Sequence, residues 1–176
     1  YYIIFVIIPL IASLIIQAKL KMTYRKYSSI DNSRRMTGFM AAQAVLGQHR
    51  ISDVSIQGAN GRLSDHFDPR DSTIRLSPEV YAGTSIAAIS IACHEVGHAV
   101  QHKEGYTPIK LRNAILPVTN IGSSLSLPLI LLGLFFSIEP FVLAGIIFFS
   151  FVVIFHLVTL PVEFNASKRA IEAIDS

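Results

Sequence analysis

The chain contains 176 residues, of which 51% are hydrophobic, and it has a formal net charge of +3 at pH 7. Its mean hydropathy of +0.49 excludes an ordinary soluble domain, so the composition predicts a single-domain membrane protein. The one cysteine, Cys93, excludes an intrachain disulfide framework and fits a reducing compartment. Because the sequence starts without methionine and stops inside an apparent helix, we expect both ends to be trimmed.

Residues 1–18 are almost continuously apolar and approach the length of a bilayer span, which predicts a first transmembrane helix. Basic residues flank this span and two later apolar segments on one side of a three-span topology: Lys19, Lys21, Arg25, Lys26, Lys110, Arg112, Lys168 and Arg169. By the positive-inside rule, that side is expected to be the cytoplasm.

Residues 19–113 are predicted to form a cytoplasmic catalytic domain. Its predicted elements are a polar linker over 23–32, an amphipathic helix over 33–46, strands over 53–57, 62–67 and 73–76, and a short helix starting at Ser77-Pro78-Glu79. The last two strands flank turn-forming residues 68–71, so we expect a small antiparallel sheet.

The central motif of this domain is His94-Glu95-Val96-Gly97-His98, which follows an Ala/Ile-rich run and predicts one helix over 84–103. His94 and His98 lie four residues apart and share a helix face, where two imidazoles can bind one tetrahedral zinc ion at about 2.0–2.1 Å. Glu95 can reach a zinc-bound water as a general base without binding the metal. The motif therefore indicates hydrolysis; the alternative is a helix whose histidines are merely hydrogen-bonded.

Residues 114–160 are predicted to form a transmembrane helical hairpin, with spans over 114–136 and 141–160. Residues 161–176 are then expected to form a cytoplasmic helix. His156 is the one ionisable group well inside the second span. It is either a functional residue or a neutral histidine bonded to a neighbouring helix.

A catalytic zinc site needs a third protein ligand and an open position for water. His102 continues the face of His94 and His98, but it lies about 12 Å along the helix from His94, too far to share one metal with both. The metzincin pattern is also excluded, because Gln101 and Glu104 stand where that pattern has glycine and histidine.

The better candidate for the third ligand is Glu163, at the cytoplasmic end of the last predicted span. It returns to the membrane face from which the HEVGH helix departs, and the intervening sequence leaves room for the hairpin. The alternative for Glu163 is a surface ion pair with Lys168 or Arg169.

Asp65, His66 and Asp68 form a second polar cluster before the motif. His66 could polarise the scissile carbonyl of a substrate. Equally, Asp65 and Asp68 could organise the Asp68-Pro69 turn through local hydrogen bonds.

Taken together, these residues resemble the YugP-type membrane-associated neutral zinc metallopeptidases over most of the chain. The resemblance rests on four runs: LSDHFDPR (63–70), IRLSPEVY (74–81), ACHEVGHA (92–99) and LPVEFNAS (160–167). It implies a gluzincin-like peptidase with His94 and His98 as zinc ligands, Glu95 as catalytic base and Glu163 as third ligand. Related membrane gluzincins usually have Asp four residues after the third ligand, where this chain has Ser167.

The sequence thus predicts an α+β integral membrane protein in which three transmembrane helices carry a gluzincin-like zinc metallopeptidase domain in the cell membrane. We expect membrane lipid and a protein or peptide substrate as partners, and no nucleic acid. An extended substrate would add to an exposed strand at 54–57 or 62–67.

Two other functions are weighed against this prediction. An intramembrane site-2-type protease would bury HExxH in a full apolar span, whereas only about nine apolar residues precede the motif here. A non-catalytic zinc-binding membrane scaffold would close the metal with four protein ligands and would need no base.

Overall fold

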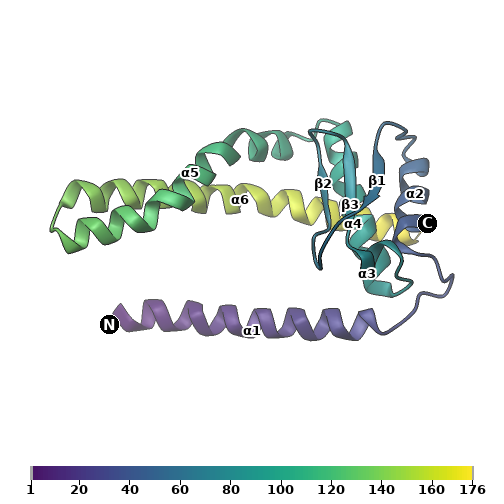
Figure 1. Cartoon of the computed structure of the whole chain (residues 1–176), viewed down its shortest axis with the longest axis horizontal. Coiled ribbons are helices and arrows are strands. Elements are labelled where there is room, and N and C mark those ends of the chain that lie inside the picture. The colour runs from purple at the N-terminus through teal and green to yellow at the C-terminus, as the bar shows by residue number, and fades with distance from the viewer. Residues whose placement is uncertain (1, 176) are drawn as a thin grey trace. The chain divides into compact units, whose positions relative to one another are not determined.

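The computed structural model describes residues 2–175, apart from the side chains of Tyr2, Phe5 and Val6. The described part is mostly helical with one small sheet (Figure 1). Its elements are α1 (Tyr2–Ser28), α2 (Gly38–Gln48), β1 (Ser55–Gly58), β2 (His66–Asp68), β3 (Thr73–Leu76), α3 (Pro78–Tyr81), α4 (Ile86–Lys103), α5 (Thr107–Phe135) and α6 (Glu139–Asp175). The chain divides into two compact units, Tyr1–Val96 with Ala173–Ser176 and Gly97–Glu172, so the division falls within α4.

Three helices are long and apolar enough to cross a membrane, over Ile7–Ser28, Thr107–Phe135 and Glu139–Asp175. The first is longer than the predicted span, because α1 continues to Ser28. The linker predicted over 23–32 is correspondingly wrong in its first half, since residues 19–28 contain neither glycine nor proline to end the helix.

Helix α6 has 37 residues and runs through the predicted boundary at Leu160 without a break. Pro161 lies inside it. At 1.5 Å per residue, α6 is about 55 Å long, well beyond the roughly 30 Å apolar thickness of a bilayer. The segment predicted as a separate helix over 161–176 is therefore the continuation of the last apolar helix.

The sheet is mixed, with strand order β1-β3-β2, which corrects the predicted antiparallel sheet. β2 and β3 pair antiparallel because the short turn after Asp68 reverses the chain. β1 instead pairs parallel with β3, since residues 59–72, including β2, provide the crossover that a parallel pair needs. β1 and β2 consequently form the two edges of the sheet.

The core of the first unit is built by α2, α3 and β3. Helix α2 buries Ala41, Ala42, Val45 and Leu46 on one face, and β3 buries Ile74 and Leu76. Helix α2 begins at Gly38 rather than at the predicted Ser33. The reason is that the Asn32 side chain accepts from the Met36 amide at 3.1 Å and donates to its carbonyl at 2.8 Å, which holds the segment before the helix in a loop.

In the second unit, α5 and α6 form an antiparallel hairpin (Figure 1). Glycines allow the two helices to approach closely. A methyl group on Gly122 would lie 2.8 Å from the Phe148 carbonyl oxygen, and one on Gly145 would lie 2.7 Å from that of Ser126. The same device recurs between the last turns of α4 and the far end of α6, where a methyl group on Gly97 would lie 2.7 Å from the Ala166 carbonyl oxygen.

Candidate metal centre

Helix α4 supplies three of the predicted site residues and starts two residues after the predicted position. The Ser85 hydroxyl accepts from the Ala88 amide at 3.1 Å, which caps its first turn. The apolar face of the helix is fully buried at Ala92 and Val96. His94 and His98 border this face and are half-buried, while Glu95 is only 9% exposed.

The third predicted ligand, Glu163, comes from α6. Its Oε2 lies 3.5 Å from His98 Nε2, and the side chains of Glu163 and His98 are 42% and 13% exposed. His94 precedes His98 by one turn of the continuous α4, so helix geometry brings its ring to the same side. One ligand atom from each of His94, His98 and Glu163 lies within 4.8 Å of the other two.

This geometry fits a tetrahedral metal site. Two ligands about 2.1 Å from a tetrahedral zinc ion are about 3.4 Å apart, close to the measured separation of His98 Nε2 and Glu163 Oε2. Two imidazoles and one carboxylate are also the donor set of catalytic zinc sites that keep a fourth position open. Among residues 2–175, no other group of three such side chains has this spacing. His102 is exposed and lies outside the group.

The sequence did not reveal the role of Gln101, which the structure places against His98. The Gln101 side chain is fully buried. Its Oε1 lies 3.1 Å from His98 Nδ1, and its Nε2 donates to the Val162 carbonyl at 2.8 Å and to Asn165 Oδ1 at 2.9 Å. In the sequence, the role of Gln101 could have been predicted only from its position, three residues after a candidate ligand and on the same helix face.

The basic residues near Glu163 contact other carboxylates. Arg169 donates to Glu104 Oε2 at 2.7 Å and to Asn165 Oδ1 at 2.8 Å. Lys168 lies 3.7 Å from Glu172. The Arg169 contacts extend the polar network around Gln101, and both basic residues have acidic partners apart from Glu163.

Comparison with known proteins identifies the family of the chain. The model of a family described as "Putative neutral zinc metallopeptidase" matches residues 2–176. The chain belongs to this family. It is also similar to the "Putative membrane protease YugP" of Bacillus subtilis (strain 168), with 45% identity over 160 residues, which cover 91% of this chain and 71% of that protein. No solved structure matches the chain. The predicted family resemblance is thus confirmed, and the zinc named by the family suits the His94, His98 and Glu163 donor set.

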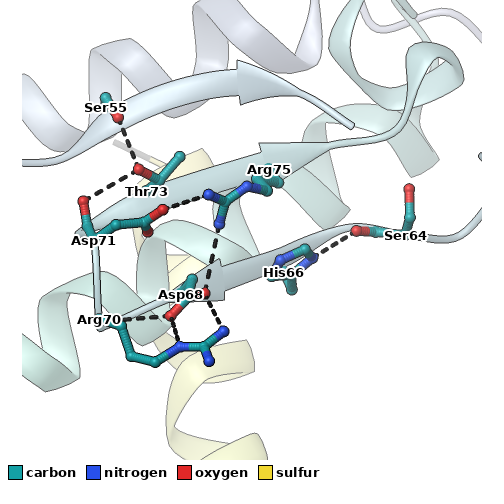
Figure 2. Close-up of polar contacts among 8 residues, drawn as sticks. All are labelled: Ser55, Ser64, His66, Asp68, Arg70, Asp71, Thr73 and Arg75. Atoms are coloured by element: carbon teal, nitrogen blue, oxygen red, sulfur yellow. Dashed lines mark hydrogen bonds and ion pairs between the residues drawn. The ribbon is translucent and has the colours of Figure 1, made fainter. Parts of the chain in front are cut away.

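Two residues of the second polar cluster, His66 and Asp68, lie on β2 (Figure 2). The Asp68 carboxylate accepts from the Arg70 amide and Nε, each at 3.0 Å, as predicted for a turn-organising residue. These hydrogen bonds from Arg70 hold the pKa of Asp68 well below its usual value. Asp65 does not organise this turn: it accepts from the Ser77 amide at 2.7 Å, at the start of α3.

His66 is exposed on the edge strand β2 (Figure 2). Its Nδ1 donates to the Ser64 carbonyl at 2.7 Å, because that oxygen can only accept. This hydrogen bond uses Nδ1 and holds the ring against the strand, so Nε2 is the nitrogen that a substrate could contact. A contact between His66 and the substrate stays a prediction.

Two further residues singled out in the sequence have local roles. Cys93 is 2% exposed, and burial raises the pKa of its thiol to about 11, as expected of a packing residue. His156 is exposed on α6, and its Nδ1 lies 2.7 Å from the Val152 carbonyl one turn earlier. Its hydrogen bond within the described residues is therefore to its own helix and not to a neighbouring one, which was one of the two predicted alternatives. The other, a functional role for His156, stays a prediction.

Proposed function

We propose that this protein is a membrane-anchored zinc endopeptidase in which His94, His98 and Glu163 bind the metal and Glu95 is the general base. The observation that supports this most is the convergence of three ligand atoms within 4.8 Å from α4 and α6. Family membership supports the same reading, since the family is described by zinc and peptide hydrolysis.

The residues divide the chemistry between them. Zinc, when bound, supplies a Lewis acid that polarises the scissile carbonyl and lowers the pKa of a bound water to about 7. Glu95 follows His94 directly, so its side chain leaves the helix about 100° around from that ring, and Glu95 lies outside the ligand group. Its role would be to accept a proton from the attacking water and pass it to the leaving amide nitrogen.

We infer that the site works at a membrane surface and faces the cytoplasm. Three long apolar helices with exposed hydrophobic side chains support the membrane, since such helices are unstable in water. Basic residues near one end of these helices support the cytoplasmic side. Substrates would then be membrane proteins or juxtamembrane segments, added in extended form to an edge of the sheet, β1 or β2.

The variant Glu95→Gln tests the proposal, because it removes the proton acceptor and keeps every proposed ligand. We expect the purified variant to bind zinc as the wild type does and to hydrolyse peptides between about 10²- and 10⁴-fold more slowly. The matched control is Glu172→Gln, the same change at an exposed α6 residue paired with Lys168, which should stay active. Wild-type protein that holds zinc but cuts no substrate would favour the scaffold alternative.

A further inference from the structure

The orientation of the Gln101 amide is fixed by its neighbours. The Val162 carbonyl can only accept a hydrogen bond, so the group 2.8 Å away from it must be the amide nitrogen of Gln101. The amide oxygen then faces His98. Because Gln101 is fully buried, water does not compete for these contacts.

The outer end of the network leads to the same orientation. Arg169 Nε can only donate, so the atom of Asn165 that lies 2.8 Å away must be its amide oxygen. That same oxygen accepts from Gln101 Nε2 at 2.9 Å. Arg169 is itself held by the Glu104 carboxylate. The network ends in a carbonyl, which can only accept, and in a guanidinium, which can only donate. Only one orientation of the Gln101 and Asn165 amides satisfies both ends.

This arrangement determines which nitrogen of His98 carries the proton. Gln101 Oε1 can only accept, so its 3.1 Å contact requires a proton on His98 Nδ1. A neutral imidazole has one ring proton, which leaves the lone pair on Nε2. Nε2 is the atom 3.5 Å from Glu163 Oε2, on the side of the candidate metal centre.

We propose that Gln101 is a positioning residue that holds His98 in the tautomer able to bind a metal through Nε2. The inference rests on the proposed function, since it assigns Gln101 a role toward the zinc ligands. Gln101 also joins the two ligand helices, because Val162 directly precedes Glu163 on α6. One side chain thus fixes both the proton of one ligand and the backbone beside another.

The first test uses the full-length, metal-free wild type at about pH 8, above the ordinary histidine pKa of about 6.5. Nitrogen-15 NMR of labelled histidine, with His98 assigned by substitution, reports which ring nitrogen is protonated. We expect His98 to be protonated at Nδ1. A His98 ring protonated at Nε2 overturns the inference without reference to zinc or activity.

The second test compares two substitutions at the same position. Gln101→Met keeps the length of the side chain but removes all three of its hydrogen bonds, and we expect zinc affinity, measured by chelator competition, to fall about 10- to 100-fold. His98 should then show both tautomers. Gln101→Glu keeps a side-chain oxygen that can accept from His98 Nδ1, so zinc affinity and the tautomer of His98 should be largely restored.

The control is Glu104→Gln, which changes the exposed end of the network and leaves the contact with His98 in place. Its zinc affinity should match the wild type. A folded Gln101→Met variant with wild-type affinity and a single Nδ1-protonated tautomer contradicts the inference. Wild-type protein that binds no zinc contradicts the proposed function instead, and the tautomer of His98 still decides the inference.

Discussion

Glu163 and His102 are the two polar residues that compete for the third ligand position next to His94 and His98. The carboxylate of Glu163 lies 3.5 Å from His98 Nε2, whereas His102 is exposed and outside the ligand group. Loss of a ligand should lower zinc affinity by more than the loss of a residue that only hydrogen-bonds a ligand, which costs about 10- to 100-fold. We therefore predict that Glu163→Ala loses zinc and that His102→Ala retains it.

Metal analysis of both purified variants, together with chelator competition, measures this difference. Each change removes one side chain that could bind a metal, so the pair is matched in chemistry. If zinc is lost from the His102 variant and kept by the Glu163 variant, the assignment of Glu163 as third ligand is wrong.

At this scale, residues close in sequence were the easiest to predict. His94, Glu95 and His98 form one motif whose geometry follows from a single helix, so the pattern sufficed. Gln101 escaped notice because its partner Val162 is 61 residues away and only the fold joins them. In the sequence, Gln101 served only to exclude another motif.

Among the elements, the packing of α4 on α6 depends on Gly97, within the HEVGH motif. A methyl group at this position would lie 2.7 Å from the Ala166 carbonyl oxygen and 3.1 Å from its Cα. Backbone atoms cannot rotate away as a flexible side chain can, so the helices would have to separate. Separation would draw Glu163 away from His98, because Glu163 lies one turn before Ala166 on α6.

We predict that Gly97→Ala lowers both zinc affinity and the free energy of unfolding, the latter by about 1–3 kcal/mol, as overpacking does. Gly47→Ala in α2 is the control, because nothing lies within 4 Å of the added methyl group. It should be neutral or stabilising by up to about 1 kcal/mol. Denaturant unfolding of the metal-free proteins and zinc titration measure the two effects. A Gly97→Ala variant with the zinc affinity and the free energy of unfolding of the wild type would contradict this prediction.

Sequence patterns did not predict the order of the strands or the end of the last helix. Alternation and turn residues located β1 and β3, and the strand predicted over 62–67 overlaps β2 only at His66 and Phe67. These patterns contain no information on which strand occupies the centre of the sheet. The parallel pairing of β1 with β3 was missed for that reason. The last span was also predicted to end at Leu160, yet apolar helices accommodate proline, and α6 continues through Pro161.

For the whole molecule, composition predicted more than periodicity did. Segments that suit a membrane identify themselves by length and hydropathy, so all three long apolar helices were found from the sequence. What composition could not reveal is that the last of them is one helix with the segment that bears Glu163. A proposed membrane anchor and a proposed metal ligand therefore belong to one continuous helix.

This continuity limits how far the site can lie from the membrane. Glu163 is three residues beyond Leu160, where the apolar run of α6 ends, which corresponds to about 4.5 Å along the helix. Because α6 is one continuous helix, Glu163 stays close to the apolar segment that precedes it. We therefore predict that the enzyme prefers peptide bonds close to the lipid headgroups over bonds in freely diffusing proteins.

The measurement uses the full-length protein in liposomes with a membrane-tethered reporter on the same face. The scissile sequence is moved outward on helical spacers, which lengthen by about 1.5 Å per residue. Because the site is proposed to lie near the surface, cleavage should be fastest at short spacers and fall as the spacer lengthens. The Glu95→Gln variant controls for other proteases. Equal rates at every spacer length, and on the same peptide without a tether, would mean that the membrane does not select the substrate.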